Sequence, residues 1–324
     1  MPSYERVMGT VCLVNLYDNN KQKCYDEIFE RLRQIDEEFD ADKKQSDIAL
    51  INDFGFERPI MVCDDVYSVL ETAVKISEIT EGAFDPTVGS LVSLWKIKSG
   101  SPHEVSDNDL KEALSVVGYK NIILDPESKS VRLKKKGIQL DLGAIAKGFA
   151  TDEIVKIFKK HKVKRAVIDL GGNIYVYGKK SLSKPWNVGI KNPQLPDSVP
   201  LVKVALPEIS VVTSGVYERF YDGSAKSYHH ILSPSDGYPV DNDILSVSVI
   251  SPSSMLADAF ATAFFVLGTE KSLQVLYSAR KEFRMEIDAI FIEKDRGIVF
   301  SENFPYFYSI LYDEWERKSP KSPL

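Results

Sequence analysis

The chain has 324 residues, with 41 basic and 47 acidic side chains and a formal net charge of −6. With 44% hydrophobic and 27% charged residues, its composition is that of a globular protein and excludes a disordered or collagen-like chain. A net negative chain is a poor candidate for binding nucleic acid, because neutralising a phosphate backbone needs a basic face, so we expect no nucleic-acid partner. The longest nearly apolar run, 259–267, is half as long as the ~18 residues that a membrane span needs.

The three cysteines, Cys12, Cys24 and Cys63, form no CxxC pair, so neither a structural zinc site nor a thioredoxin-like motif is expected. The first residues show no basic segment followed by an apolar one, which predicts no signal peptide in this chain. A cytosolic protein and a chain whose export signal has been removed both fit this start.

The first part of the chain is predicted to be mostly helical. We expect a strand over 7–17 and helices over 21–39, over 64–79 with Gly82 as its C-terminal cap, and from Ser106 to Val117, with Gly118 following its end. In the first helix, Cys24, Ile28 and Leu32 recur at a spacing of four, which predicts one apolar face. Ser106 and Asp109 have the spacing of a capping box at the start of the third.

The second part of the chain is predicted to be rich in short strands. We expect strands over 121–124, 130–133, 138–142, 165–170, 174–177, 186–190, 201–206, 209–213 and 245–251, helices over 151–160 and 255–267, and a closing hairpin of 289–293 and 297–301. Because helices and strands are segregated rather than alternating, the sequence predicts an α+β fold. We expect one large domain of two joined halves over 1–317 and a flexible tail over 318–324.

Familiar nucleotide and hydrolase motifs are absent from the sequence, because it contains no G-x-G-x-x-G, Walker A, H-E-x-x-H or G-x-S-x-G pattern. A first cluster of interest runs over 140–150, where a predicted strand gives way to a helix. Gly143 and Gly148 permit close approach of a ligand, and Lys147 together with helix-start N–H groups favours an anion. The alternative is a tight turn with a solvated lysine.

Two further clusters carry oxygen and amide groups. Gly171, Gly172 and Asn173 follow an apolar strand, where paired glycines permit unusual backbone angles and the amide can bind a phosphate or a ring edge; a plain turn is the alternative. Asp258 and Thr262 are four residues apart on a mostly apolar helix and share one face. Their oxygens suit Mg²⁺, although a helix-start carboxylate and a threonine bonded to the preceding turn would also fit.

A fourth cluster combines 213–219 with 229–239. In an extended segment His229 and His230 face opposite ways, so one could be a structural residue and the other a general base.

Taken together, these clusters resemble the FAD:protein FMN transferase family, the ApbE-like flavin transferases. The resemblance covers most of the chain and rests on Met8-Gly9-Thr10, Ser46 with Asn52, the stretch 81–88, the turn 141–150, Gly171-Gly172-Asn173, Thr213-Ser214-Gly215, the segment 230–239 and the helix 257–262. It implies an α+β domain related to the T-fold, with two halves and a central flavin-binding cleft. It also implies transfer of FMN from FAD to a threonine or serine hydroxyl of an acceptor flavoprotein, with release of AMP.

The resemblance also implies roles for particular residues. Mg²⁺ would be held by Asp258, Thr262 and the carbonyl of Ala144, and His230 would be the catalytic general base. The positions that would contact the FAD substrate, through its flavin, adenosine or phosphates, are Met8, Gly9, Thr10, Asp42, Asp85, Lys147, Gly172, Asn173 and Ser214.

One departure from the family pattern concerns the loop after the first helix. Many relatives carry Ser-x-Tyr-Arg where this chain has Asp40-Ala41-Asp42-Lys43, and the tyrosine position shapes the flavin pocket. Asp42 therefore leaves open the balance between transfer and hydrolysis of FAD to FMN and AMP. A non-catalytic flavin-binding protein is the alternative from another class, although it would have no use for a metal site beside a base.

The resemblance implies a location in the periplasm or on the outer face of the bacterial inner membrane. Relatives there are often lipoproteins, attached to the membrane by a lipid anchor, and this chain contains no lipobox cysteine.

Overall fold

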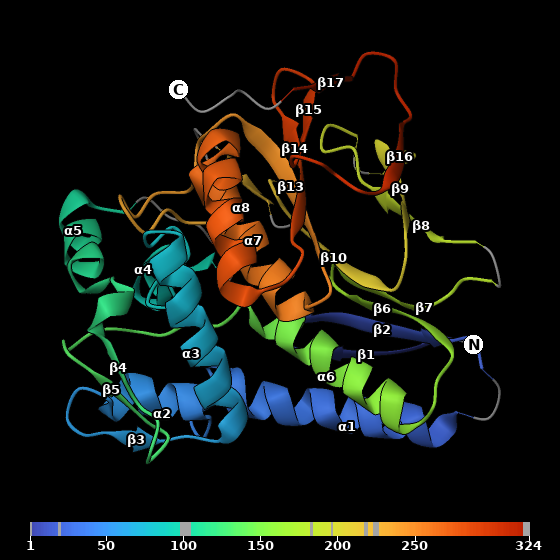
Figure 1. The fold of residues 1–324 in the computed structure, drawn as a ribbon. Helices are drawn as coiled ribbons and strands as arrows, with labels where there is room; N and C mark the ends of the chain where they lie inside the picture. Colours follow the sequence, from blue (N-terminus) through green and yellow to red (C-terminus); the bar gives the residue numbers. More distant parts are fainter. Residues whose placement is uncertain are drawn as a thin grey trace. The chain divides into compact units, whose positions relative to one another are not determined.

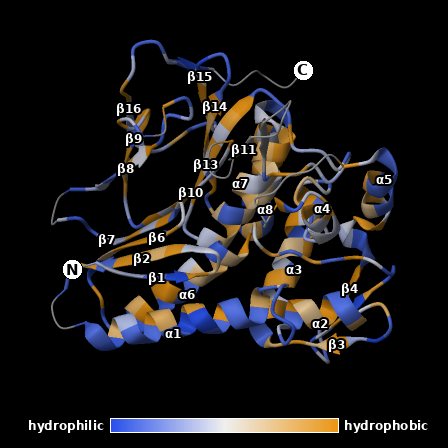
Figure 2. Cartoon of the chain, turned by 180° about the vertical axis from the view of Figure 1, so that it is seen from behind, coloured by the Kyte–Doolittle hydropathy of each residue, from blue (hydrophilic) through white to orange (hydrophobic). Residues whose placement is uncertain are grey.

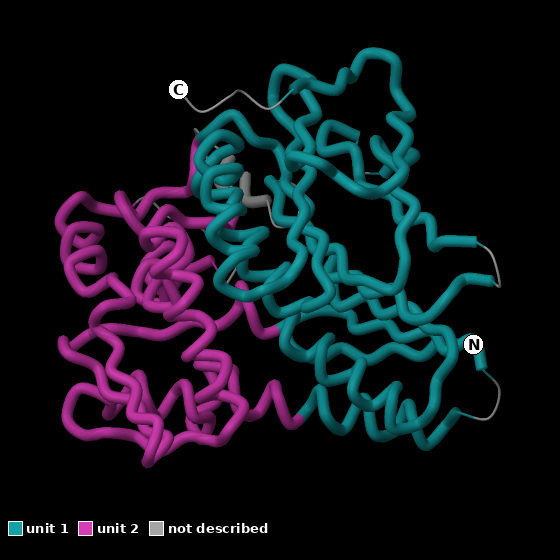
Figure 3. Tube along the Cα trace, in the orientation of Figure 1, with its two compact units in different colours: residues 1–33, 147–217, 242–324 teal, residues 34–146, 218–241 magenta. Residues whose placement is uncertain are grey.

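The computed structural model describes residues 2–18, 21–97, 105–181, 184–195, 197–216, 220–222 and 227–319, and Figure 1 shows its mixture of helices and strands. The α+β prediction is confirmed. Two compact units make up the chain (Figure 3). The first unit comprises Met1–Arg33, Lys147–Tyr217 and Asn242–Leu324, and the second comprises Gln34–Ala146 and Glu218–Asp241.

The first unit contains a nine-stranded sheet whose neighbours are antiparallel, except for the last, parallel pair. In spatial order its strands are β1 (Ser3–Val7), β2 (Thr10–Leu16), β6 (Arg165–Leu170), β7 (Asn173–Gly178), β10 (Ile209–Gly215), β13 (Ile244–Ser251), β14 (Asp288–Glu293), β15 (Gly297–Phe300) and β17 (Glu316–Lys318). Figure 2 shows hydrophobic residues along much of β2, β6 and β14. The single strand predicted over 7–17 is wrong at its start, because Met8 and Gly9 form a two-residue turn between β1 and β2. Their φ angles of 54° and 70° are positive, as type I′ hairpin turns require.

A smaller sheet and four helices complete the first unit. The sheet has the order β16 (Phe307–Ile310), β9 (Val202–Leu206) and β8 (Trp186–Ile190), and the helices are α1 (Gln22–Phe39), α6 (Ala146–Lys160), α7 (Ser254–Leu267) and α8 (Thr269–Phe283). The last residues of α1, after Arg33, belong to the second unit, and so does Ala146, the first residue of α6. Helix α7 packs on β10 and β13, and its alanines, among them Ala259 and Ala263, are fully buried. These small side chains let the helix lie close to the sheet.

The second unit is mainly helical. It contains α2 (Asp47–Phe54), α3 (Asp64–Ile79), α4 (Gly89–Leu94), α5 (Asp107–Val116), a short 3₁₀ helix η2 (Tyr119–Asn121), a sheet of β3 (Ile60–Met61), β5 (Ser130–Leu133) and β4 (Ile122–Asp125), and a hairpin of β11 (Phe220–Asp222) and β12 (Ser227–His229). Ser46 caps α2 by accepting a hydrogen bond from the N–H of Ala49.

The strand predicted over 138–142 is wrong. Only a single bridge forms there, between Val88 and Gln139. The side-chain amide of Asn52 bonds both backbone groups of Leu140, at 2.6 and 3.1 Å, and so takes the place of a neighbouring strand.

The chain's last described residues belong to the sheet. Strand β17 includes Lys318, whose ammonium bonds Glu293 at 3.3 Å and also Asp295, so the strand reaches into the predicted tail. Residues 320–324 of that tail lie outside the described residues. None of the described helices is long and apolar enough to cross a membrane.

Candidate functional site

One end of the nine-stranded sheet gathers most of the residues predicted in the first unit. The strand pairing places Cys12 opposite Leu170 and Val212 opposite Asn173. Turns between antiparallel neighbours lie at the ends of the strands. The pairing therefore brings the Met8–Gly9 turn, the Gly171–Gly172 turn and the end of β10 to the same end of the sheet. Ser214 lies there too, buried on β10. The structure thus brings together segments far apart in sequence.

The glycine turn at this edge leaves its backbone accessible. Gly171 is exposed and has a φ of 62°, and a Cβ on it would lie 2.3 Å from the hydroxyl of Thr10. Gly172 has a φ of 91° and donates its N–H to Oδ1 of Asp169 at 2.9 Å. A side chain at Gly171 would both clash and strain the turn, so glycine keeps the turn close to Thr10 and open to a ligand.

Asn173 follows the glycine turn and is bonded to two helices. Its side chain is fully buried, and its Oδ1 accepts hydrogen bonds from the hydroxyls of Thr151 at 3.0 Å and Ser254 at 2.7 Å. The amide oxygen thus ties β7 to α6 and α7. The structure gives Asn173 a scaffold role, and its contact with the cofactor stays a prediction.

Asp258 is a buried carboxylate where α7 meets the start of α6. Its side chain is 5% exposed, its Oδ2 accepts the N–H of Gly148 at 2.8 Å, and its Oδ1 lies 3.7 Å from the ammonium of Lys147. First-turn N–H groups have no partner within their own helix, so a carboxylate stabilises them. The prediction that this helix begins at Thr151 is wrong by five residues, since the helix starts at Ala146.

These residues fit a small, hard cation. Thr262 is half-buried one helical turn beyond Asp258 and shares its face. The described residues contain no group of three or more His, Cys, Asp and Glu side chains able to hold a metal. Mg²⁺ needs no such group, because it commonly takes one or two protein carboxylates and completes its shell with water and substrate phosphates. Ala144 lies in the second unit, in the turn that leads into α6, and the role of its carbonyl stays a prediction.

Asp85 is a buried structural anchor of the second unit. One carboxylate oxygen accepts the N–H and the hydroxyl of Thr87 at 2.8 and 2.6 Å, and the other accepts the N–H of Tyr119 at 2.8 Å. Burial raises the pKa of this carboxyl, and the hydrogen bonds partly oppose that shift. These bonds join two loops, and the predicted ligand contact of Asp85 stays a prediction.

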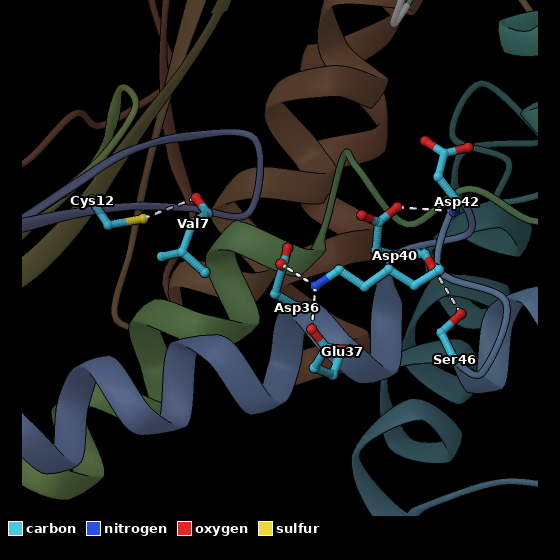
Figure 4. A network of polar contacts seen from close by, with 8 residues as sticks. Val7, Cys12, Asp36, Glu37, Asp40, Asp42 and Ser46 are labelled. Atoms are coloured by element: carbon cyan, nitrogen blue, oxygen red, sulfur yellow. Dashed lines mark hydrogen bonds and ion pairs between the residues drawn. The ribbon is translucent and has the colours of Figure 1, made fainter.

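Asp42 lies in a preorganised loop of the second unit, which Figure 4 shows at close range. The ammonium of Lys43 contacts Asp36 at 2.5 Å and Glu37 at 2.7 Å, and the hydroxyl of Ser46 donates to the carbonyl of Asp40 at 2.7 Å. Asp42 itself is exposed, and its N–H donates to Oδ1 of Asp40 at 3.0 Å. The loop is held in place while its central carboxylate faces solvent.

His230 follows directly after β12 and is half-buried. The side chains of His229 and His230 are predicted to alternate along an extended segment, but β12 ends at His229, so the strand does not include His230. The side chain of His229 lies outside the described residues. The segment after His230 is anchored by Trp95, whose indole N–H donates to the carbonyl of Gly237 at 2.7 Å. Sequence reasoning missed this anchor, although a lone tryptophan among apolar residues was its available signal.

Comparison with known proteins gives a consistent result. A family model described as the ApbE family matches residues 8–289. The chain is 37% identical over 311 residues to an FAD:protein FMN transferase of Treponema pallidum, covering 91% of this chain and 84% of that protein. It is 34% identical to one of Klebsiella pneumoniae, covering 92% and 91%. The crystal structure of an ApbE protein from Thermotoga maritima superposes with a TM-score of 0.82 at 31% identity, over 94% of this chain and 97% of that one.

Proposed function

Because the chain belongs to the ApbE family and is an enzyme of the FAD:protein FMN transferase type, we propose that it transfers FMN from FAD to a threonine or serine hydroxyl of an acceptor flavoprotein. The acceptor oxygen attacks the phosphorus of the FMN portion, and the bond from that phosphorus to the bridging oxygen breaks. AMP leaves with the bridging oxygen, and the hydroxyl proton passes to a base. The buried Asp258 beside Lys147 is the observation that carries the proposal.

Charge neutralisation is the main task at this site, since phosphoryl transfer needs positioning and electrostatic stabilisation more than covalent help. Lys147 supplies a cation, and the exposed turn at Gly171 can approach a phosphate closely. Asp258 and Thr262 would hold Mg²⁺, which when bound neutralises pyrophosphate charge. His230 would accept the proton of the acceptor hydroxyl.

Mg²⁺ dependence is tested by substitution on α7. Asp258→Ala removes the only charged ligand among those proposed, and we expect a rate loss of roughly 10²-fold or more, as for other electrostatic stabilisers. Flavinylation of an acceptor, read as protein-bound flavin fluorescence, measures it. Thr262→Val and Thr262→Ser form a matched pair, because only the first removes the hydroxyl; only Thr262→Val should raise the Mg²⁺ concentration needed. Full activity of Asp258→Ala, or of the wild type in EDTA, contradicts the proposal.

A second candidate activity is hydrolysis of FAD to FMN and AMP. The observation that favours it is the exposed carboxylate of Asp42, which can orient a water molecule. Many relatives carry a tyrosine at this position instead. The extracytoplasmic location stays a prediction.

A further inference from the structure

Two helices of the first unit exchange carboxylates at their N-terminal ends. Asp258 of α7 accepts the N–H of Gly148 in the first turn of α6 at 2.8 Å. In return, Asp152 of α6 accepts the N–H groups of Ser254 at 2.8 Å and Met255 at 3.1 Å, in the first turn of α7. In each helix the carboxylate lies four residues after the N–H group that the other helix caps, so the two contacts are reciprocal.

The cap that Asp152 provides is nearly complete. The hydroxyl of Ser253 donates to Asp152 at 2.9 Å and accepts the N–H of Leu256 at 3.3 Å. The N–H groups of Ser254, Met255 and Leu256 thus all have protein partners. These three N–H groups are therefore not available to bind a phosphate. Their hydrogen bonds instead hold the start of α7 in place.

Close packing leaves little room for the two helices to slide. A Cβ on Gly148 would lie 2.3 Å from the carbonyl oxygen of Ser254 and 2.6 Å from the Cα of Met255. The hydroxyl of Ser254 is bonded in addition to Asn173 at 2.7 Å and to Ser210 at 2.9 Å. Backbone contact and hydrogen bonds together fix the first turn of α7 against α6, β7 and β10.

We propose that Asp152 is a positioning residue for Asp258, and this rests on the proposed function, in which Asp258 is the charged metal ligand. Asp152 fixes the rotation and axial position of α7 one turn before Asp258. The reciprocal bond from Gly148 then holds Oδ2 of Asp258, which leaves Oδ1 directed toward the side where Lys147 lies. Groups that orient a metal ligand in this way typically change metal affinity 10- to 100-fold when they are removed.

Asp152→Asn tests the proposal, because an asparagine would turn an NH₂ group toward an N–H donor. Its matched control is Glu153→Gln on the same helix. Glu153 accepts from Arg31 of α1 at 2.9 Å, so it joins α6 to α1 rather than to α7. Mn²⁺ is titrated into FAD-saturated protein, and the loss of the free-ion electron paramagnetic resonance signal gives its Kd. Urea unfolding of both variants measures stability alongside.

We expect Asp152→Asn to raise the Mn²⁺ Kd about 10-fold or more, and Glu153→Gln to bind like the wild type even if it is less stable. An unchanged Kd in Asp152→Asn, with binding lost in Asp258→Ala, overturns the positioning role alone. If the wild type takes up no Mn²⁺, the metal proposal fails and the positioning role falls with it. Should Asp152→Asn not fold, Ser253→Ala removes one of the three hydrogen bonds that Asp152 accepts, and we expect a smaller rise of the Mn²⁺ Kd. An unchanged Kd in that variant contradicts the positioning role.

Discussion

His229 and His230 are neighbours in sequence but differ in backbone environment, since one ends β12 and the other begins an anchored turn. We predict that His230→Ala slows transfer by roughly 10²-fold or more, as expected when a general base is lost, while FAD still binds. His229→Ala should act mainly through stability. Single-turnover flavinylation, with FAD affinity measured separately by flavin fluorescence, distinguishes the two effects, and the reverse pattern would reassign the base to His229.

Asp85 makes the stability of the second unit depend on pH in an unusual direction. Burial raises its pKa above the ordinary 3.8, so its contribution to stability is complete below that value and is lost as the pH rises through the folded-state pKa. We predict that the wild type loses part of its advantage in free energy of unfolding over Asp85→Asn as the pH rises through the folded-state pKa of Asp85. Urea unfolding at a series of pH values measures this difference.

The exposed Asp125 provides the control, because its pKa is lowered, chiefly by a hydrogen bond from Ser128. Its contribution is present above the ordinary carboxyl pKa and is lost as the pH falls, so the advantage of the wild type over Asp125→Asn should change in the opposite direction. Parallel trends in the two comparisons would contradict the role assigned to Asp85.

At the level of elements, the crossing of α6 and α7 depends on the absence of a side chain at Gly148. Alanine favours a helix over glycine by about 1 kcal/mol, but here its Cβ would lie 2.3 Å from a backbone carbonyl oxygen. We predict that Gly148→Ala lowers the free energy of unfolding by about 1–3 kcal/mol, as overpacking does. Gly143→Ala in the same sequence cluster should cost less, because its closest neighbour is the Asp141 side chain. Equal costs for the two variants would count against the close crossing.

Elements with strong local patterns were predictable from sequence, whereas those fixed by distant partners were not. The bounds of α3, β5, β6 and β8 match the predicted ranges, since alternating or helical periodicity and flanking turns agree there. The start of α6 was missed because Gly148 lowers local helix propensity, and its capping group, Asp258, lies 110 residues away. Helices α2 and α8 and strands β1, β16 and β17 were also missed.

The same division holds for the candidate site. Asp258, Thr262 and Lys147 could be named as candidates from spacing and resemblance, because each has a local signature, and their roles stay predictions. Asp152 had no local signature, and Trp95 had only that of a tryptophan among apolar residues. The hydrogen bonds of both depend on partners about 100 residues or more away in the chain, Ser254 and Gly237.

For the whole molecule, the outcome of the reaction depends on how well water is excluded, because the same groups would serve water or an acceptor hydroxyl. We predict slow Mg²⁺-dependent hydrolysis of FAD to FMN and AMP without acceptor, and we expect Asp42→Tyr to suppress hydrolysis more than transfer. Chromatography of the nucleotides, with and without a threonine-bearing acceptor, measures both rates. If FAD survives for hours with Mg²⁺ while an acceptor is flavinylated quickly, the enzyme is a strict transferase.

The order of strands in the large sheet has a consequence for synthesis on the ribosome. Strand β13 lies between β10 and β14, so everything on one side of it is made before residue 244 and everything on the other side afterwards. Proteins emerge N-terminus first, and until β13 leaves the exit tunnel the nascent sheet ends at β10 with an unpaired edge. Exposed edges of this kind invite pairing with other chains. The nascent chain is therefore most exposed to aggregation between the emergence of β10 and the emergence of β13 from the exit tunnel, and that interval is when a chaperone would protect it.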